Sequence, residues 1–139
     1  MKIVSTILSV MILCTLVPAD DPVPYLKSAP MPFYPPIARQ ARIEGTVKVH
    51  ATVNQDGDTT EIEALSGHAL LRSATVEYVK GWKFIWPHPC ACKAKRDITF
   101  LYKMSGKEAS ANSPTATVRW FGSSLVEVEA DELPFETQN

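Results

Sequence analysis

The sequence predicts an α+β domain in which a small antiparallel sheet packs against one main helix. Apolar and polar residues alternate over residues 47–53, as in a half-buried strand. Over residues 69–80 the apolar residues recur every three or four positions, which is typical of an amphipathic helix. Alternation returns over residues 96–104. We expect about three strands backed by one helix, with an added C-terminal hairpin, and the 139 residues suit one such domain.

Residues 1–19 have the layout of a secretory signal peptide. Lys2 is the only charge before Asp20, an apolar run covers residues 3–17, and small residues lead to Ala19. The run is shorter than the roughly 20 residues that a membrane-spanning helix needs. We therefore predict cleavage near Ala19 and a periplasmic or secreted product, with a retained membrane anchor as the alternative.

Residues 20–29 are predicted to be a proline-rich lead-in, extended over the domain. Proline fixes φ and lacks a backbone N–H, so this stretch cannot form a regular helix or an inner strand. Pro35 and Pro36 can open a short helix that continues to about residue 42, because proline is favourable at the first helical position.

The first two strands are predicted to form an antiparallel hairpin. In the first strand Val47, Val49, Ala51 and Val53 face one way. The turn falls at residues 54–58, where Gly57 readily supplies a positive φ. The second strand covers about residues 59–65.

The main helix is predicted over residues 69–80, with Ser66 as its cap and Gly81 as its stop. Its buried stripe is Leu71, Ala74 and Tyr78, continuing to Trp82. The chain then re-enters extended structure at Trp82-Lys83-Phe84, and residues 85–95 form an irregular loop.

The C-terminal third is predicted to begin with a strand over residues 96–104 that pairs with the first hairpin. A polar linker and an extra hairpin fill residues 105–132, with strand pieces at 115–121 and 125–130. Residues 133–139 read as a flexible tail.

Cys90 and Cys92 are the two cysteines outside the predicted signal peptide, and in an exported protein they are expected to pair locally. Free thiols or a bond to another chain remain alternatives. Together with His88 they also raise a thiol-redox or soft-metal hypothesis. Zinc sites favour a wider spacing between cysteines and four ligands, so we assign no metal.

No set of residues predicts an enzyme or a cofactor site. Ser66 and His68 lie in one turn without a nearby acid, and Glu61 and Glu63 are expected to form a solvated strand face. A net charge of −1 without basic runs gives no indication of nucleic-acid binding.

The motifs together resemble the C-terminal domain of TonB-type energy transducers, over residues 30–104. Two positions depart from the family pattern: Arg72 stands where the family has an aspartate, and the proline after the tryptophan-x-phenylalanine element is displaced to Pro87. The matching positions are Tyr34, Pro35, Ala38, Gly45, Val47, Val49, Gly57, Ser66, Gly67, Leu71, Ala74, Trp82 and Phe84.

The resemblance implies a non-catalytic binding domain whose exposed strand edge pairs with a short segment of a protein or peptide in the cell envelope, such as an outer-membrane transporter. The candidate edge is the strand carrying Arg96, Ile98, Phe100 and Tyr102, or the C-terminal hairpin if the hairpin covers that edge. Exposed edges also allow a homodimer.

A membrane-anchored energy transducer is the alternative reading. Residues 20–36 would reach only about 50 Å at about 3.1 Å per residue, which is a short spacer for a transducer. We therefore favour a stand-alone TonB-like domain.

Overall fold

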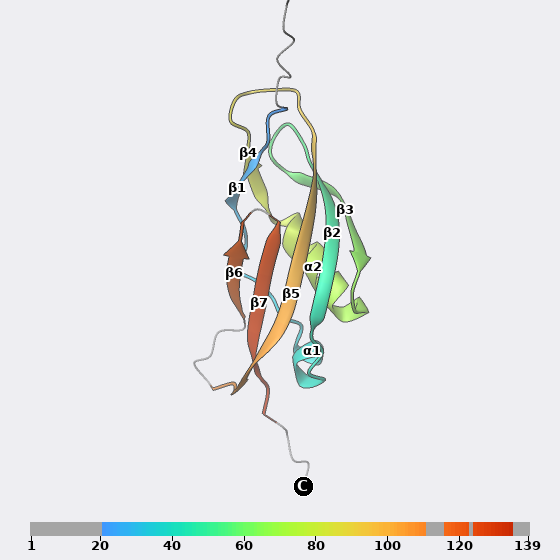
Figure 1. The fold of residues 1–139 in the computed structure, drawn as a ribbon, viewed down its shortest axis with the longest axis vertical. Coiled ribbons are helices and arrows are strands. Elements are labelled where there is room, and N and C mark those ends of the chain that lie inside the picture. Colours follow the sequence, from blue (N-terminus) through green and yellow to red (C-terminus); the bar gives the residue numbers. More distant parts are fainter. Residues whose placement is uncertain (1–20, 111–115, 123, 135–139) are drawn as a thin grey trace, which may run out of the picture.

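The computed structural model describes residues 21–110, 116–122 and 124–134, so the predicted signal peptide and most of the predicted tail lie outside the described residues. Seven strands and two helices are assigned within them (Figure 1). In chain order they are β1 (Tyr25–Ser28), α1 (Pro36–Gln40), β2 (Gly45–Val53), β3 (Thr59–Ser66), α2 (Ala69–Lys80), β4 (Lys83–Ile85), β5 (Ala94–Glu108), β6 (Thr117–Phe121) and β7 (Leu125–Glu132). The predicted α+β class is confirmed.

The main sheet has the strand order β3-β2-β5-β7-β6. β2 pairs antiparallel with both β3 and β5, as predicted from the alternation. The sheet is nevertheless mixed rather than antiparallel, because β7 runs parallel to β5. The hairpin places its more apolar strand inside: Val126 and Val128 of β7 are 1 % exposed, whereas β6 is largely exposed and takes the edge. β6 pairs antiparallel with β7, so β7 runs in the direction of β5 and β6 runs against it.

The proline-rich lead-in contains a strand that the sequence did not predict. β1 pairs antiparallel with β4 in a separate two-stranded ribbon, in which Leu26 lies opposite Phe84. β1 is bordered by prolines, and among the described strands it pairs with β4 alone. This agrees with the exclusion of proline-rich chain from inner strands.

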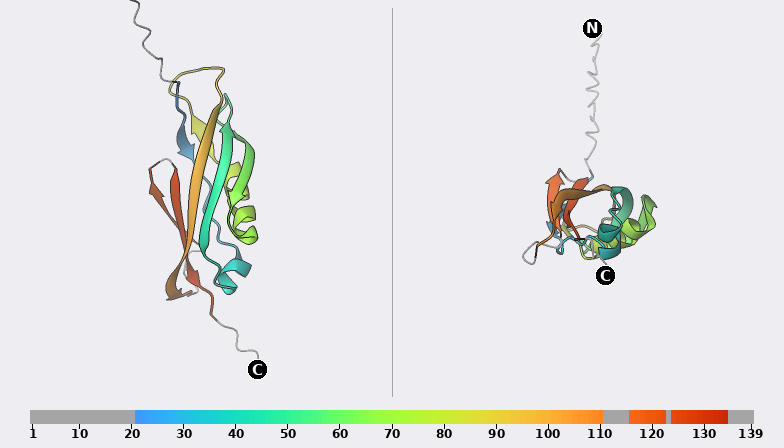
Figure 2. Two further views of the ribbon diagram at one scale, coloured as in Figure 1. Left: turned by 45° about the vertical axis from the view of Figure 1, so that its right-hand side comes forward. Right: turned by 90° about the horizontal axis from the view of Figure 1, so that it is seen from below.

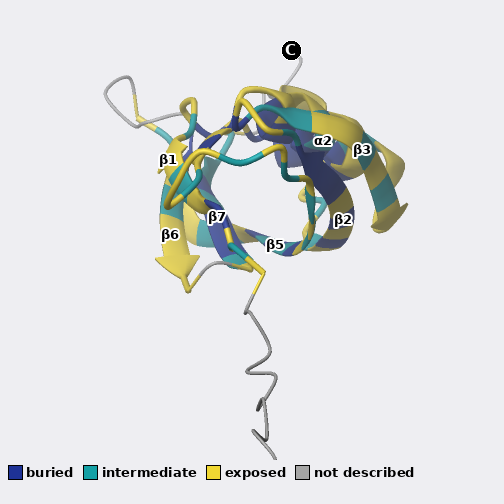
Figure 3. Cartoon of the chain, turned by 90° about the horizontal axis from the view of Figure 1, so that it is seen from above, coloured by how far each residue is buried: buried dark blue, intermediate teal, exposed yellow. Residues whose placement is uncertain are grey.

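The core lies between the main sheet and α2. Seen from above, the sheet curves around its buried face, with α2 across from β5 (Figure 3). Trp82 is 1 % exposed, and its ring lies near those of Tyr78, Phe100 and Trp120, at centroid distances of 5.6, 5.7 and 5.1 Å. This tryptophan, predicted to fill the interface of sheet and helix, therefore joins α2, β5 and β6.

The start of α2 differs from the expectation. His68, rather than Ser66, is the N-cap, and its Nδ1 accepts a hydrogen bond from the Leu70 amide at 3.3 Å. Ser66 is the last residue of β3, opposite Lys48. Gly67 separates the two at a φ of +111°, where a Cβ would lie 2.7 Å from Val47 Cγ2. The sheet therefore continues one residue further than predicted, and glycine makes the turn into the helix.

α1 ties the lead-in to the far side of the sheet. It begins with proline, as predicted, and the Arg39 guanidinium donates two hydrogen bonds to the main-chain oxygen of Asp131 in β7, at 3.0 and 2.7 Å. The Tyr34 hydroxyl donates to the Ile43 carbonyl at 2.6 Å. The hairpin is therefore held at both ends, by the contact of Trp120 with Trp82 and by the hydrogen bonds of Arg39 to β7. Figure 2 shows the two hairpin strands, coloured orange and red, beside β5.

Candidate partner-binding edge

The main sheet has two edge strands, β3 and β6. The β3 edge is irregular: its register with β2 shifts twice, and Glu61 has a φ of 47°. Bulges of this kind twist an edge away from regular pairing. α2 also packs against β3. β3 is therefore a poor template for another strand.

β5, the strand predicted to bind, is an inner strand for most of its length. Phe100 pairs with Val126 and Tyr102 with Val128, so β5 has neighbours on both sides there. Arg96 and Ile98 lie before the first pair with β7, and no strand ladder is recorded on that side of them within the described residues. All four side chains lie on the core side of the sheet. The sequence left two candidate edges open, the strand that became β5 and the C-terminal hairpin. On this side of the sheet the hairpin carries the edge.

β6 is regular and exposed. All five residues from Thr117 to Phe121 pair with β7 without a register shift. Trp120 is 40 % exposed and Phe121 is 50 % exposed, so two large apolar side chains reach solvent from this short strand. Within the described part of the chain, no ladder pairs with the other side of β6. Its outward main-chain groups can therefore accept a further strand.

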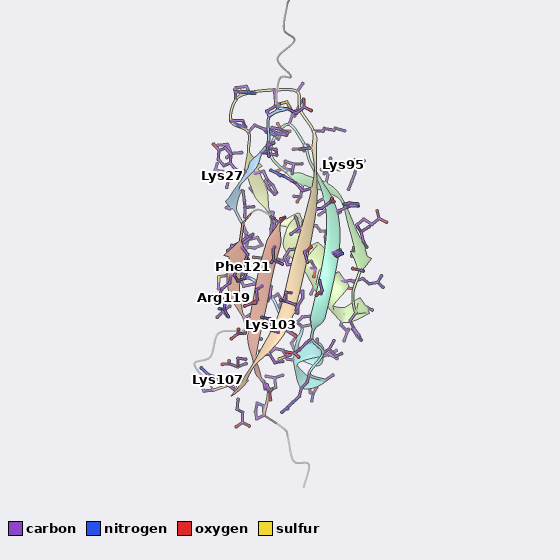
Figure 4. All side chains as sticks on the ribbon, in the orientation of Figure 1. Lys27, Lys95, Lys103, Lys107, Arg119 and Phe121 are labelled. Carbon is purple, nitrogen blue, oxygen red and sulfur yellow. A yellow bond between two sulfur atoms is a disulfide. The ribbon has the colours of Figure 1, made fainter. Side chains whose placement is uncertain are left out.

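An ion-pair ladder braces β6 and β7 from the outer face of the sheet. Glu127 of β7 lies 2.7 Å from Lys103 Nζ and 2.9 Å from Arg119 Nη2, and Arg119 also reaches Glu129 at 3.0 Å. Lys103, Arg119 and Phe121 are labelled in Figure 4. Glu127 is only 5 % exposed. The Lys103 hydrogen bond, followed by the charge of Arg119, lowers the pKa of its carboxyl group against the opposing effect of burial.

Sequence reasoning missed this ladder. The alternation of Val126 and Val128 with Glu127 and Glu129 indicated that the carboxylates share a face. The ion pair of Glu127 with Lys103 could not be inferred, because it requires β5 and β7 to be neighbours in parallel register. In that register Lys103 lies directly opposite Glu129, one position along the same face from Glu127.

The cysteine loop lies away from this edge. The Cys90 and Cys92 sulfur atoms are 2.08 Å apart, at disulfide distance. No group of three or more His, Cys, Asp or Glu residues that could hold a metal ion occurs among the described residues. His88 is exposed in the same loop. This region therefore holds a local covalent link between Cys90 and Cys92.

The fold and the edge define a class: small α+β domains with one helix behind a curved sheet and a strand edge open to pairing. Comparison with known families identifies which family within this class the chain belongs to. The model of the Gram-negative bacterial TonB protein C-terminal family matches residues 30–104, over half of the chain, and the chain belongs to this family. No curated protein matches the chain.

Membership places the chain among non-enzymatic interaction domains that act in the cell envelope, in protein interaction or energy transduction. Domains of the family interact with proteins such as outer-membrane transporters. Among the described residues, no helix is long and apolar enough to cross a membrane. The family match ends at residue 104, whereas the sheet continues through β6 and β7.

Proposed function

We propose that this chain is a non-catalytic binding module that recruits an extended segment of an envelope protein by strand addition at β6. The observation that carries the proposal is the regular five-residue ladder of β6 with β7, next to an outer edge that no described strand pairs with. A strand added there gains main-chain hydrogen bonds, which supply affinity whatever the sequence of the partner.

The side chains of β6 supply specificity. Successive residues of a strand point to opposite faces, so Arg119 and Phe121 flank an added strand on the outer face and Trp120 flanks it on the core face. Trp120 rests on Trp82, which gives it a fixed position and an exposed surface. An added segment with an apolar residue beside Trp120 and another beside Phe121 would bury both rings.

The segment is proposed to come from an envelope protein, and family membership makes an outer-membrane transporter the first candidate. A second copy of the chain, pairing β6 with β6, would produce the homodimer. Size-exclusion chromatography with light scattering separates these two: a monomer that binds an envelope protein supports the first, and a dimer that dissociates when β6 is altered supports the second.

A matched pair of proline variants tests the edge. In an antiparallel ladder, neighbouring residues turn their N–H groups to opposite sides of the strand. Of the variants Arg119→Pro and Val118→Pro, one therefore loses an N–H that points outward, and the other loses an N–H that bonds to β7. The proline ring itself also hinders strand pairing at either position. Arg119→Ala and Val118→Ala, which remove the side chain and keep the main-chain N–H, therefore serve as controls.

Binding is read by pulldown from a Gram-negative envelope extract, and folding by thermal unfolding. The variant that loses the outward N–H should remain folded and lose the partner, while its alanine counterpart, which keeps that main-chain donor, should lose only the contribution of its side chain. If every folded variant captures the same partner as the wild type, β6 is not the binding edge.

The proposed location is the periplasm, after cleavage near Ala19. Mass spectrometry of the mature N-terminus tests it: a chain that begins at Asp20 supports a free module, and a chain that retains residues 1–19 in the membrane favours the anchored energy transducer instead.

A further inference from the structure

A cavity adjoins the edge strand β6, between the end of that strand and the β1–β4 ribbon. In the view from above, β1 and β6 lie at the same side of the molecule (Figure 3). The volume of the cavity is ≈ 380 Å³, within the range of about 300–1,000 Å³ that binding pockets occupy. Trp82 and Phe84, both buried, and Leu26, which is half-buried, provide apolar walls. The sheet therefore has an apolar hollow directly beside its open edge.

The other walls of the cavity are mostly apolar and reach solvent. Val23 and Tyr25 from the start of the ribbon line the cavity and are exposed, and so is Trp120 of β6. Arg96 is the only charged residue among the described residues that line it, and its guanidinium donates a hydrogen bond to the carbonyl of Pro24. The surface offered to an occupant is therefore largely apolar, and covering such surface favours binding.

The register of a strand added at β6 points one of its side chains at this cavity. Trp120 lies on the core face of the sheet, because its ring centroid is 5.1 Å from that of Trp82. Residues that lie directly opposite each other in a strand pair have their side chains on the same face. The residue of the added strand opposite Trp120 therefore projects its side chain to the core face, where the cavity lies.

We propose that the cavity receives one large apolar side chain, aromatic or of the size of leucine, from the added strand at the position opposite Trp120. This proposal rests on strand addition at β6 and defines which segments are accepted there. The partner is an extended segment of an envelope protein with a bulky apolar residue at that position. Main-chain hydrogen bonds hold the segment, and the anchor residue selects it.

Charged anchor residues fit the cavity less well. The unpartnered N–H groups of Trp82 and Arg96 are enclosed by the fold, so an acidic side chain in the cavity gains no hydrogen bond from them. A basic side chain would lie on the same wall as the guanidinium of Arg96. A small apolar molecule could fill the volume, but it would leave the outward main chain of β6 without a partner. An apolar residue carried by an added strand covers both surfaces.

Two short end-blocked threonine peptides that differ only in their central residue, phenylalanine or alanine, provide the test. Threonine favours extended chain. Binding to the full chain is measured by fluorescence anisotropy of the labelled peptides, and the backbone amide signals of residues 117–121 in the ¹⁵N-labelled protein report pairing with β6. Both peptides should shift these signals, and the phenylalanine peptide should bind about tenfold or more tightly, because it buries a large side chain.

Leu26→Trp fills the cavity from its wall and should abolish the preference for phenylalanine while the alanine peptide binds as before. Lys27→Trp is the matched control, because it adds the same ring at the next position of β1, an exposed residue that does not line the cavity. Thermal unfolding checks that both variants fold. If Leu26→Trp does not fold, Val23→Trp, at an exposed position on the cavity wall, serves in its place.

The outcomes separate the anchor from strand addition. Equal binding of the two peptides, with shifted amides at residues 117–121, would leave strand addition standing and overturn the anchor. A preference for phenylalanine that Leu26→Trp retains would place the anchor elsewhere. Tight binding of N-acetylphenylalanine amide, equal to that of the peptide, would show that the cavity acts without a strand. If neither peptide binds at millimolar concentration, the anchor is refuted, and strand addition is then judged by the proline variants and the captured partner alone.

Discussion

Replacement of Val128 by alanine should destabilise the domain by about 2 kcal/mol, although this residue lies beyond the family match. Val128 is 1 % exposed and sits between Tyr102 on β5 and Val118 on β6. The change removes two carbons, at about 0.8 kcal/mol each from transfer, and the cavity left behind adds to this cost. For a domain of this size the loss corresponds to a fall in melting temperature of about 10 °C.

Urea unfolding followed by tryptophan fluorescence measures the change. Val49→Ala, at a 1 % exposed position on β2, should cost about the same, while Val23→Ala, at a 60 % exposed position, should change the free energy of unfolding by less than about 0.5 kcal/mol. If Val49→Ala costs about 2 kcal/mol and Val128→Ala behaves like Val23→Ala, the hairpin is not part of the cooperative fold.

Three further predictions concern single side chains. The pKa of Glu127 is lowered in the folded state, so this carboxylate stabilises the fold above the unfolded pKa near 4.5, and the contribution is lost as pH falls through the folded pKa. The melting temperatures of Glu127→Gln and the wild type should therefore converge on acidification from pH 7 to pH 3. A difference that stays constant over this range would count against the ion-pair ladder. Burial raises the pKa of Tyr102 to about 12, so the stability of the fold should fall as pH rises above 10, where the unfolded state ionises first. Tyr102→Phe should lose about 1 kcal/mol of stability at pH 7, because the hydrogen bond to Thr75 is removed, and its stability should decline less than that of the wild type between pH 10 and 12. An equal decline in the two proteins would refute this assignment. Gly57→Ala should cost about 3 kcal/mol in urea unfolding, because φ is +84° and the new Cβ would lie 2.0 Å from the Phe84 oxygen; a near-neutral effect would show that the turn can move.

Local patterns predicted the central elements well. The alternation around Val49 and the helical stripe from Leu71 to Tyr78 correspond to β2 and α2. The glycine turn at Gly57 joins β2 to β3, and Trp82 fills the core as expected. These features depend on the period of burial and on backbone freedom, which are written in neighbouring residues.

Long-range pairing could not be predicted in the same way. The sequence indicated a C-terminal hairpin, but nothing in its pattern determines which of its strands pairs with β5, or that this pairing is parallel. β1 was also missed, because proline-rich chain has a weak strand pattern and only its pairing with β4 makes it a strand. The candidate site moved from β5 to β6 for this reason: an edge is a property of the assembled sheet.

Hydrogen–deuterium exchange of the full chain, with and without the envelope segment captured by cross-linking, tests the central claim most directly. If strand addition occurs at β6, the backbone amides of residues 117–121 should gain protection on binding, while those of β3, Thr59–Ser66, exchange as before. Protection that appears along β3, or an unchanged β6 in a saturated complex, would contradict it.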